Sequence, residues 1–259
     1  MPRIIGVISG KGGVGKTTTA INLGAAFSSK FNKKVTIVDC NITTPHVSLA
    51  LGLAHDSFST LNEVLLGKKE FEEVVHYFSP GLSIIPASLS VHDLKGIDIG
   101  KLDETIKEKF EVHDFVILDS APGLGKEAMS TILASDELVF VTTPHLVSIS
   151  DVIRTKQIAR NLGKDILGVI VNMKHDKHSE LTDRQIENFT QLPVLGVINY
   201  DKDILSSLTA KQPLVLMNEK SKTSKEFIKI ASLIAGKEIK MRNDWFSRFS
   251  DYFYRIFKY

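Results

Sequence analysis

The stretch Gly10-Lys11-Gly12-Gly13-Val14-Gly15-Lys16-Thr17 decides the fold of this chain. It follows the apolar run Ile4–Ser9, which predicts a buried strand, and it opens the segment Thr17–Ser29, which predicts a helix. A glycine-rich turn that ends in Lys-Thr between a strand and a helix matches the phosphate-binding pattern G-x-x-x-x-G-K-[ST]. Backbone N–H groups of such a loop point at phosphate oxygens, and the helix N-terminus adds partial positive charge. The sequence therefore predicts a nucleotide site at this turn.

Within this loop, the residue types assign different roles to the side chains. Lys16 is expected to reach the β- and γ-phosphates of ATP, and the Thr17 hydroxyl is expected to hold Mg²⁺. Lys11 stands at the start of the loop, where a second cation is redundant for holding phosphate and could face another subunit. The residues expected to contact the nucleotide are Gly12, Gly13, Val14, Gly15, Lys16, Thr17 and Thr18.

Outward from the loop, apolar runs of strand length alternate with segments of helical spacing, which predicts an α/β fold with a mostly parallel sheet and helices on both faces. The expected strands are Ile4–Ser9, Val35–Asp39, Leu82–Pro86, Phe115–Asp119, Leu138–Thr142, Leu167–Asn172 and Val194–Ile198. The expected helices are Thr17–Ser29, Asp103–Phe110, Lys126–Ala134, Ser148–Leu162, Asp183–Thr190, Lys202–Ala210 and Lys222–Ala235, with short helical pieces at Leu61–Leu66 and Phe71–His76.

Composition favours one globular domain in the 259 residues, of which 43% are hydrophobic and 24% charged. No apolar run is long enough to cross a bilayer, and the N-terminus lacks the layout of a signal peptide, so we expect a cytoplasmic protein. The only cysteine, Cys40, cannot supply a metal or iron–sulfur cluster and is expected to be a small buried residue. His46, His55, His175 and His178 form no ligand cluster and are expected on the surface.

The loop resembles that of the ParA/MinD family of deviant Walker A ATPases, whose K-G-G-x-G-K-[ST] motif here reads Lys11-Gly12-Gly13-Val14-Gly15-Lys16-Thr17. The resemblance covers essentially the whole chain. It implies an ATPase in which Lys11 contacts the nucleotide of the partner in an ATP-sandwiched homodimer. It is closest to the MinD branch of the family.

Three further segments match the family pattern, one of them imperfectly. The family's D-x-D switch appears as Asp39-Cys40-Asn41, so the second aspartate, which in the family supports activation of the attacking water, is an amide. Because an amide orients water but takes no proton, slow hydrolysis is expected, with nucleotide binding without turnover as the alternative. The resemblance also implies that Asp119 holds Mg²⁺ through water and that the Gly123 backbone senses the γ-phosphate. Asn172 is expected to read the adenine edge.

The end of the chain differs from its body in charge and pattern. Residues 1–239 carry 27 basic and 28 acidic residues, whereas residues 240–259 carry five and two. We therefore divide the chain into an ATPase domain (1–236), a linker (237–243) and an amphipathic helix (244–259). One stripe of that helix carries the apolar residues Trp245, Phe246, Phe249, Tyr252, Phe253, Ile256 and Phe257. A basic, aromatic stripe predicts a helix lying on an anionic membrane surface. Packing on the chain's own domain, a dimer partner or another protein remains an alternative.

Together with these patterns, the family resemblance implies a MinD-like ATPase that dimerises with ATP, binds the inner face of the cell membrane peripherally, and is released by slow hydrolysis. Such a protein would position division or other polar machinery and could respond to an activator protein. A ParA-type DNA-partition ATPase is the runner-up, although the neutral body speaks against nucleic-acid binding. An ATP-gated membrane scaffold with little or no hydrolysis is the third interpretation.

Overall fold

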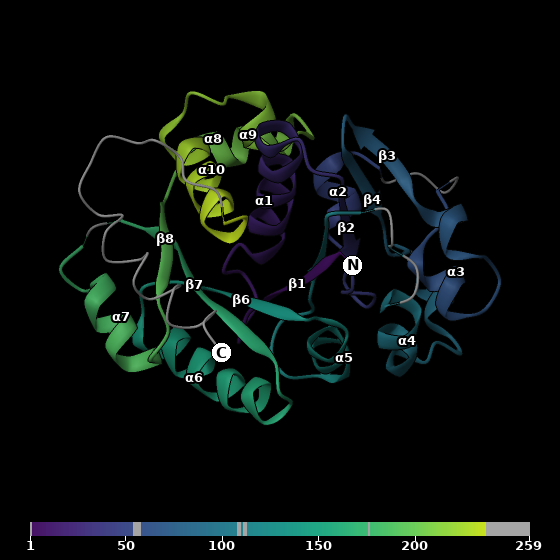
Figure 1. Cartoon of the computed structure of the whole chain (residues 1–259), viewed down its shortest axis with the longest axis horizontal. Coiled ribbons are helices and arrows are strands. Elements are labelled where there is room, and N and C mark those ends of the chain that lie inside the picture. The colour runs from purple at the N-terminus through teal and green to yellow at the C-terminus, as the bar shows by residue number, and fades with distance from the viewer. Residues whose placement is uncertain (1, 54–57, 108–109, 111–112, 176, 237–259) are drawn as a thin grey trace.

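The computed structural model describes residues 2–53, 58–107, 110, 113–175 and 177–236 (Figure 1). Its centre is one eight-stranded sheet with the order β3-β4-β2-β5-β1-β6-β7-β8. All strand pairs in it are parallel except β3 with β4, which confirms the predicted α/β class with a mostly parallel sheet. The strands are β1 (Arg3–Ile8), β2 (Val35–Asp39), β3 (His76–Ser79), β4 (Leu82–Ile85), β5 (Phe115–Asp119), β6 (Glu137–Thr142), β7 (Asp165–Lys174) and β8 (Val194–Asn199).

Helices cover both faces of this sheet. Figure 1 shows α1, α8, α9 and α10 on one side and α5, α6 and α7 on the other, with α3 and α4 near the β3 end. The described helices are α1 (Lys16–Phe31), α2 (Val47–Leu51), α3 (Leu61–Leu65), α4 (Leu102–Lys107), α5 (Lys126–Ala134), α6 (Leu146–Asn161), α7 (Asp183–Thr190), α8 (Lys202–Thr209), α9 (Leu214–Met217) and α10 (Lys222–Ile234). No helix in the described part of the chain has the length and apolar character needed to cross a membrane.

The central strands are buried because both of their faces meet helices. β2 and β5 are buried along their whole length, as their continuous apolar runs predict. On the α1 face, the ring of Phe27 from α1 stacks on Phe115 of β5, with centroids 4.3 Å apart. This packing fixes α1, and with it the glycine-rich loop, against the middle of the sheet.

One predicted helix near the edge of the sheet needs correction, and some short elements were not predicted. The helical piece expected over Phe71–His76 ends early, since a 3₁₀ turn covers Phe71–Val74 and His76 already belongs to β3. β3 itself was not expected, because its residues are only partly buried and carry no continuous apolar run. α2 and α9, of five and four residues, are likewise too short to show helical periodicity in the sequence.

The predicted linker and amphipathic helix lie outside the described residues. The same holds for the whole apolar stripe from Trp245 to Phe257. The division into domain, linker and membrane helix therefore stays a prediction.

Candidate nucleotide-binding site

The glycine-rich loop joins the carboxyl end of β1 to the start of α1, as predicted. Gly15 takes a φ of +84°, and a side chain there would also meet the Asn172 amide nitrogen at 2.1 Å. Both constraints exclude larger residues at this position. At the other end of the loop, a Cβ on Gly10 would stand 2.1 Å from the Cβ of Asp151 in α6. The loop is thus held between β7 and α6, which fixes the path of its backbone.

Lys16, Thr17 and Asp119 form one hydrogen-bonded group beneath the loop. The Lys16 ammonium lies 2.9 Å from one carboxylate oxygen of Asp119, and the Thr17 hydroxyl donates to the other at 2.6 Å. Lys16 is 7% exposed and Asp119 is fully buried. The two motifs recognised separately in the sequence, at the ends of β1 and β5, therefore meet in the structure.

The oxygen atoms of this group suit a magnesium ion. Mg²⁺ prefers hard oxygen ligands and keeps several waters, so one hydroxyl and one carboxylate with substrate phosphates form an adequate ligand set. Thr17 and Asp119 are the residues that would hold it. Their direct hydrogen bond shows that both oxygens already face the same point.

Asp39, at the end of β2, organises the backbone that follows it. One of its carboxylate oxygens accepts the N–H groups of His46 and Val47, at 3.0 and 2.9 Å, and the other accepts that of Asn41 at 3.1 Å. Burial, followed by the negative charge of Asp119, raises the pKa of Asp39 to about 7, although these three N–H bonds oppose the shift. Asp39 therefore folds residues 41–47 around its carboxylate.

Asn41 lies in that loop, and its side-chain amide is hydrogen-bonded to Thr44. Its Nδ2 donates to the Thr44 carbonyl at 2.5 Å, and its Oδ1 accepts from the Thr44 hydroxyl at 3.0 Å. Thr43, between them, donates through its backbone N–H to the Glu127 carboxylate at 3.0 Å and through its hydroxyl to the same oxygen. Glu127 belongs to the first turn of α5, so the loop after β2 is tied to the segment after β5.

The side-chain amide of Asn172 and the backbone N–H of Gly123, which were predicted to contact the nucleotide, donate hydrogen bonds to other residues of the chain. The Asn172 Nδ2 donates to the Val14 carbonyl at 2.8 Å, and the Gly123 N–H donates to the Ser9 carbonyl at 3.0 Å. Asn172 keeps its Oδ1 as the acceptor that an adenine amino group would need. Gly123, with φ at +79°, would have to leave Ser9 before its N–H could meet a phosphate.

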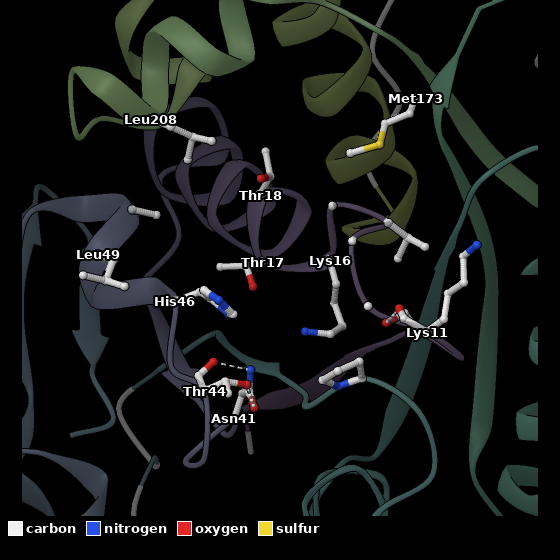
Figure 2. A pocket seen from close by; sticks show the side chains of 17 residues that line it. Lys11, Lys16, Thr17, Thr18, Asn41, Thr44, His46, Leu49, Met173 and Leu208 are labelled. Atoms are coloured by element: carbon white, nitrogen blue, oxygen red, sulfur yellow. Dashed lines mark hydrogen bonds between the residues drawn. The ribbon is translucent and has the colours of Figure 1, made fainter. Parts of the chain in front are cut away.

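The glycine-rich loop and Asn41 line a cavity of about 540 Å³, a volume typical of ligand pockets. Asp39, Asp119, Gly123 and Asn172 lie close to that loop but are not among the residues that line the cavity. Figure 2 shows Thr17 and Thr18 on one side of it and Asn41 and Thr44 on the other, with His46 between them facing Lys16. Lys11 also lines the cavity and is exposed. The sequence interpretation missed Thr44, His46, Leu49, Ala50, Pro122, Met173 and Leu208, which complete the wall together with Ser9.

Cys40 is fully buried, as predicted. Burial, with the charges of Asp39 and Asp119, raises the pKa of its thiol well above the ordinary value. A protonated, inaccessible thiol is neither a nucleophile nor a metal ligand.

Known proteins resemble this chain over nearly its whole length. A ParA family model, described as NUBPL iron-transfer P-loop NTPase, matches residues 1–235. An uncharacterised ATP-binding protein of Methanocaldococcus jannaschii is 34% identical over 90% of this chain and 87% of its own. The septum site-determining protein MinD of Thermotoga maritima is 32% identical over 95% of this chain and 92% of its own.

Solved structures give the same result. MinD of Pyrococcus horikoshii in complex with Mg-ADP has a TM-score of 0.87 and 31% identity, and the match covers 93% of this chain and all of that one. MinD in a MinC:MinD cell division complex from Aquifex aeolicus has a TM-score of 0.82 and 26% identity, and the match covers 93% and 99%. The iron-transfer description of the family model has no counterpart here in cysteine ligands, since the chain holds only Cys40.

Proposed function

The chain belongs to the ParA family of P-loop NTPases, and from this membership we propose that it is a MinD-like ATPase. In this proposal ATP closes a homodimer around two nucleotides, the dimer binds an anionic membrane through its C-terminal helices, and slow hydrolysis releases it. The protein would reside in the cytoplasm and peripherally on the inner face of the membrane, where it would position division or other polar machinery.

The contrast between two lysines of the same loop carries this proposal. Lys16 is buried and paired with Asp119, as a residue that holds the chain's own nucleotide must be. Lys11, five residues earlier, is exposed at the cavity mouth. A cation placed there can reach a phosphate that a second subunit presents across the mouth. The loop thus supplies one lysine to each side of a shared nucleotide.

The site's own residues support a two-state cycle. Asp119 holds the Lys16 ammonium and the Thr17 hydroxyl, so the triphosphate must take over both partners when it binds. Bound Mg²⁺ would bridge phosphate oxygens and neutralise charge that develops during transfer. Gly123 would exchange its bond to Ser9 for one to the γ-phosphate, which links the phosphate to the segment that leads into α5.

Partners follow from the family at a coarser level. MinD of Aquifex aeolicus forms a complex with MinC, which supports a protein partner, including an activator, for the present chain. The membrane contact would be made by Trp245, Phe246, Phe249, Phe253, Ile256 and Phe257. Pairing two such weak helices in one dimer multiplies their apparent affinity through effective concentration.

Co-sedimentation with anionic liposomes tests the membrane part of the proposal. The full chain and a version ending at Lys240 are compared with ATP, ADP or no nucleotide. We expect the full chain to pellet mainly with ATP and the shortened one to stay in the supernatant. Phe249→Asp with Phe253→Asp should abolish pelleting, whereas Ser247→Asp with Ser250→Asp adds the same charge on the polar face and should weaken it far less.

Other outcomes separate the competing functions. Equal pelleting of the two chain lengths would reject the membrane role. Salt-sensitive binding to duplex DNA in the ATP state would instead favour a ParA-type partition function. ATP-dependent pelleting without any phosphate release would favour a scaffold that does not turn ATP over.

A further inference from the structure

We infer that His46 accepts the proton of the attacking water in ATP hydrolysis, a role that rests on the proposed ATPase function. The sequence predicts His46 on the surface together with His55, His175 and His178, and His46 is indeed exposed. The structure places it in the wall of the nucleotide cavity. It adds a catalytic residue next to the Asp39-Cys40-Asn41 segment, in which Asn41 replaces the second acid of the family pattern.

The position of His46 is set by its backbone and not by its ring. Its N–H donates to Asp39 at 3.0 Å, and its carbonyl accepts from Ala50 in the first turn of α2. Figure 2 shows the imidazole extending from the start of α2 into the cavity, between Thr17 on one side and Asn41 and Thr44 on the other, facing the Lys16 side chain. The ring therefore lies on the side of the cavity where Lys16 would hold the γ-phosphate.

Asn41 is unable to perform this step. A side-chain amide has no group that takes up a proton at neutral pH. Both ends of the Asn41 amide are also bonded to Thr44, at 2.5 and 3.0 Å. At the family position that normally supports water activation, this chain therefore has a group that takes no proton and is hydrogen-bonded within its own loop.

The other residues that line the cavity offer no substitute. The remaining polar side chains in the lining are the lysines Lys11 and Lys16 and the hydroxyl residues Ser9, Thr17, Thr18 and Thr44. Ammonium groups are already protonated, and hydroxyls are too weakly basic. Imidazole is the side chain best suited to accept a proton near neutral pH. Within the described cavity lining, the step falls to His46.

The chemistry balances without a further reactant. The water oxygen forms a bond to the γ-phosphorus while the bond from that phosphorus to the β–γ bridging oxygen breaks. The water proton passes to the free imidazole nitrogen and the electron pair of the broken bond leaves with ADP. His46 then returns the proton to phosphate or to solvent, which restores the neutral ring.

Phosphate release from radiolabelled ATP under single-turnover conditions, with Mg²⁺ and the full chain, tests this role. We expect His46→Ala to lower the rate about 100-fold, within the range that general-base catalysis supplies, while the Kd for ATP stays the same. His46→Gln, which can orient water but not take its proton, should lose a similar factor. His178→Ala, an exposed histidine away from the cavity, serves as the matched control and should leave the rate unchanged.

The most discriminating comparison uses Asn41→Asp, which restores a carboxylate at the second position of the Asp39-Cys40-Asn41 segment. In that background, His46→Ala should cost less than about 3-fold, because two groups that serve one step give non-additive losses. An equal loss in both backgrounds would mean that His46 acts structurally, and a wild-type rate for His46→Ala would remove it from the mechanism. ATP binding with no phosphate release by the wild type would also overturn the role, whereas no ATP binding at all would overturn the proposed function itself.

Discussion

Asp119 compensates the charge of Lys16 in the structure described here, through an ion pair of 2.9 Å that is almost fully shielded from solvent. Removing one partner of such a pair leaves an uncompensated buried charge. The triphosphate can displace Asp119 because it offers Lys16 several negative oxygens at once. The sequence predicted the role of each residue toward the nucleotide, but not that they satisfy one another without it, since motifs carry no information on distances between strand ends.

Asp39 makes stability depend on pH in a direction opposite to that of most carboxylates. Its pKa is raised from 3.8 to about 7 in the folded chain, so the folded state binds the proton more tightly than the unfolded state. The free energy of unfolding therefore falls as pH rises from about 4 to about 7. Between pH 5 and 8, the difference in unfolding free energy between wild type and Asp39→Asn should shrink by about 2–3 kcal/mol.

Urea unfolding at several pH values, with EDTA and without nucleotide, measures this difference. Asp39→Asn is expected to be less stable throughout, because an amide cannot accept all three N–H bonds, so only the pH dependence is diagnostic. Asp114→Asn is the control. The Lys33 hydrogen bond, with others, lowers the pKa of Asp114, so its contribution is complete above about pH 4 and stays constant over this range. A pH-independent difference for Asp39→Asn would contradict the raised pKa.

At the scale of elements, the sequence predicted the strands that are buried on both faces and missed the strand that is only partly buried. The runs at β2 and β5 are apolar because helices cover both faces, and their ends were placed correctly at Asp39 and Asp119. β3 is a partly buried, antiparallel edge strand, so no continuous apolar run marks it. The position of His46 was missed for a related reason. It is the N-cap residue of α2, which has only five residues and so shows no helical periodicity, and the N–H groups of His46 and Val47 at its start bond to Asp39 at the end of β2.

The bond between Thr43 and Glu127 connects the loop after β2 to α5. Both the N–H and the hydroxyl of Thr43 donate to one Glu127 oxygen. We expect Glu127→Ala to raise amide hydrogen exchange over residues 41–47 about 10-fold, since hydrogen bonds to a charged group are stronger than neutral ones but this one is partly exposed. Mass spectrometry of exchanged peptides measures it. Lys126→Ala, in the same turn, is the control, and equal exchange in both variants would show that the contact does not restrain the loop.

Helix α1 is fixed to the sheet by the stack of Phe27 on Phe115. Phe27→Ala should lower the free energy of unfolding by about 3–5 kcal/mol, because a fully buried ring leaves a cavity. Phe189→Ala, whose ring is about half exposed, should cost far less. The two variants are compared by their midpoints of urea unfolding, provided that the dependence of the unfolding free energy on urea concentration is unchanged. Similar losses for the two variants would mean that the contact between Phe27 and Phe115 does not hold α1 on the sheet.

At the scale of the whole molecule, the two proposed activities belong to different parts of the sequence. The nucleotide site lies at the carboxyl ends of β1, β2, β5 and β7, where parallel sheets commonly bind ligands. The predicted membrane stripe belongs to the last sixteen residues of the chain, after the predicted linker. In the proposed function, nucleotide state controls membrane affinity through the assembly of two chains.

Lys11→Ala in the full chain tests that requirement. The variant retains Lys16, Thr17 and Asp119, so it should bind ATP with an affinity close to that of the wild type. It should also retain an intact C-terminal segment, and hence the weak membrane affinity of one helix. If ATP acts by pairing two helices, the gain in liposome affinity with ATP over ADP, which can reach about 100-fold for linked sites, should disappear. Lys220→Ala, an exposed lysine outside the site, should keep the gain. A variant that stays monomeric by light scattering yet pellets with ATP like the wild type would show that the nucleotide acts on the membrane segment within one chain.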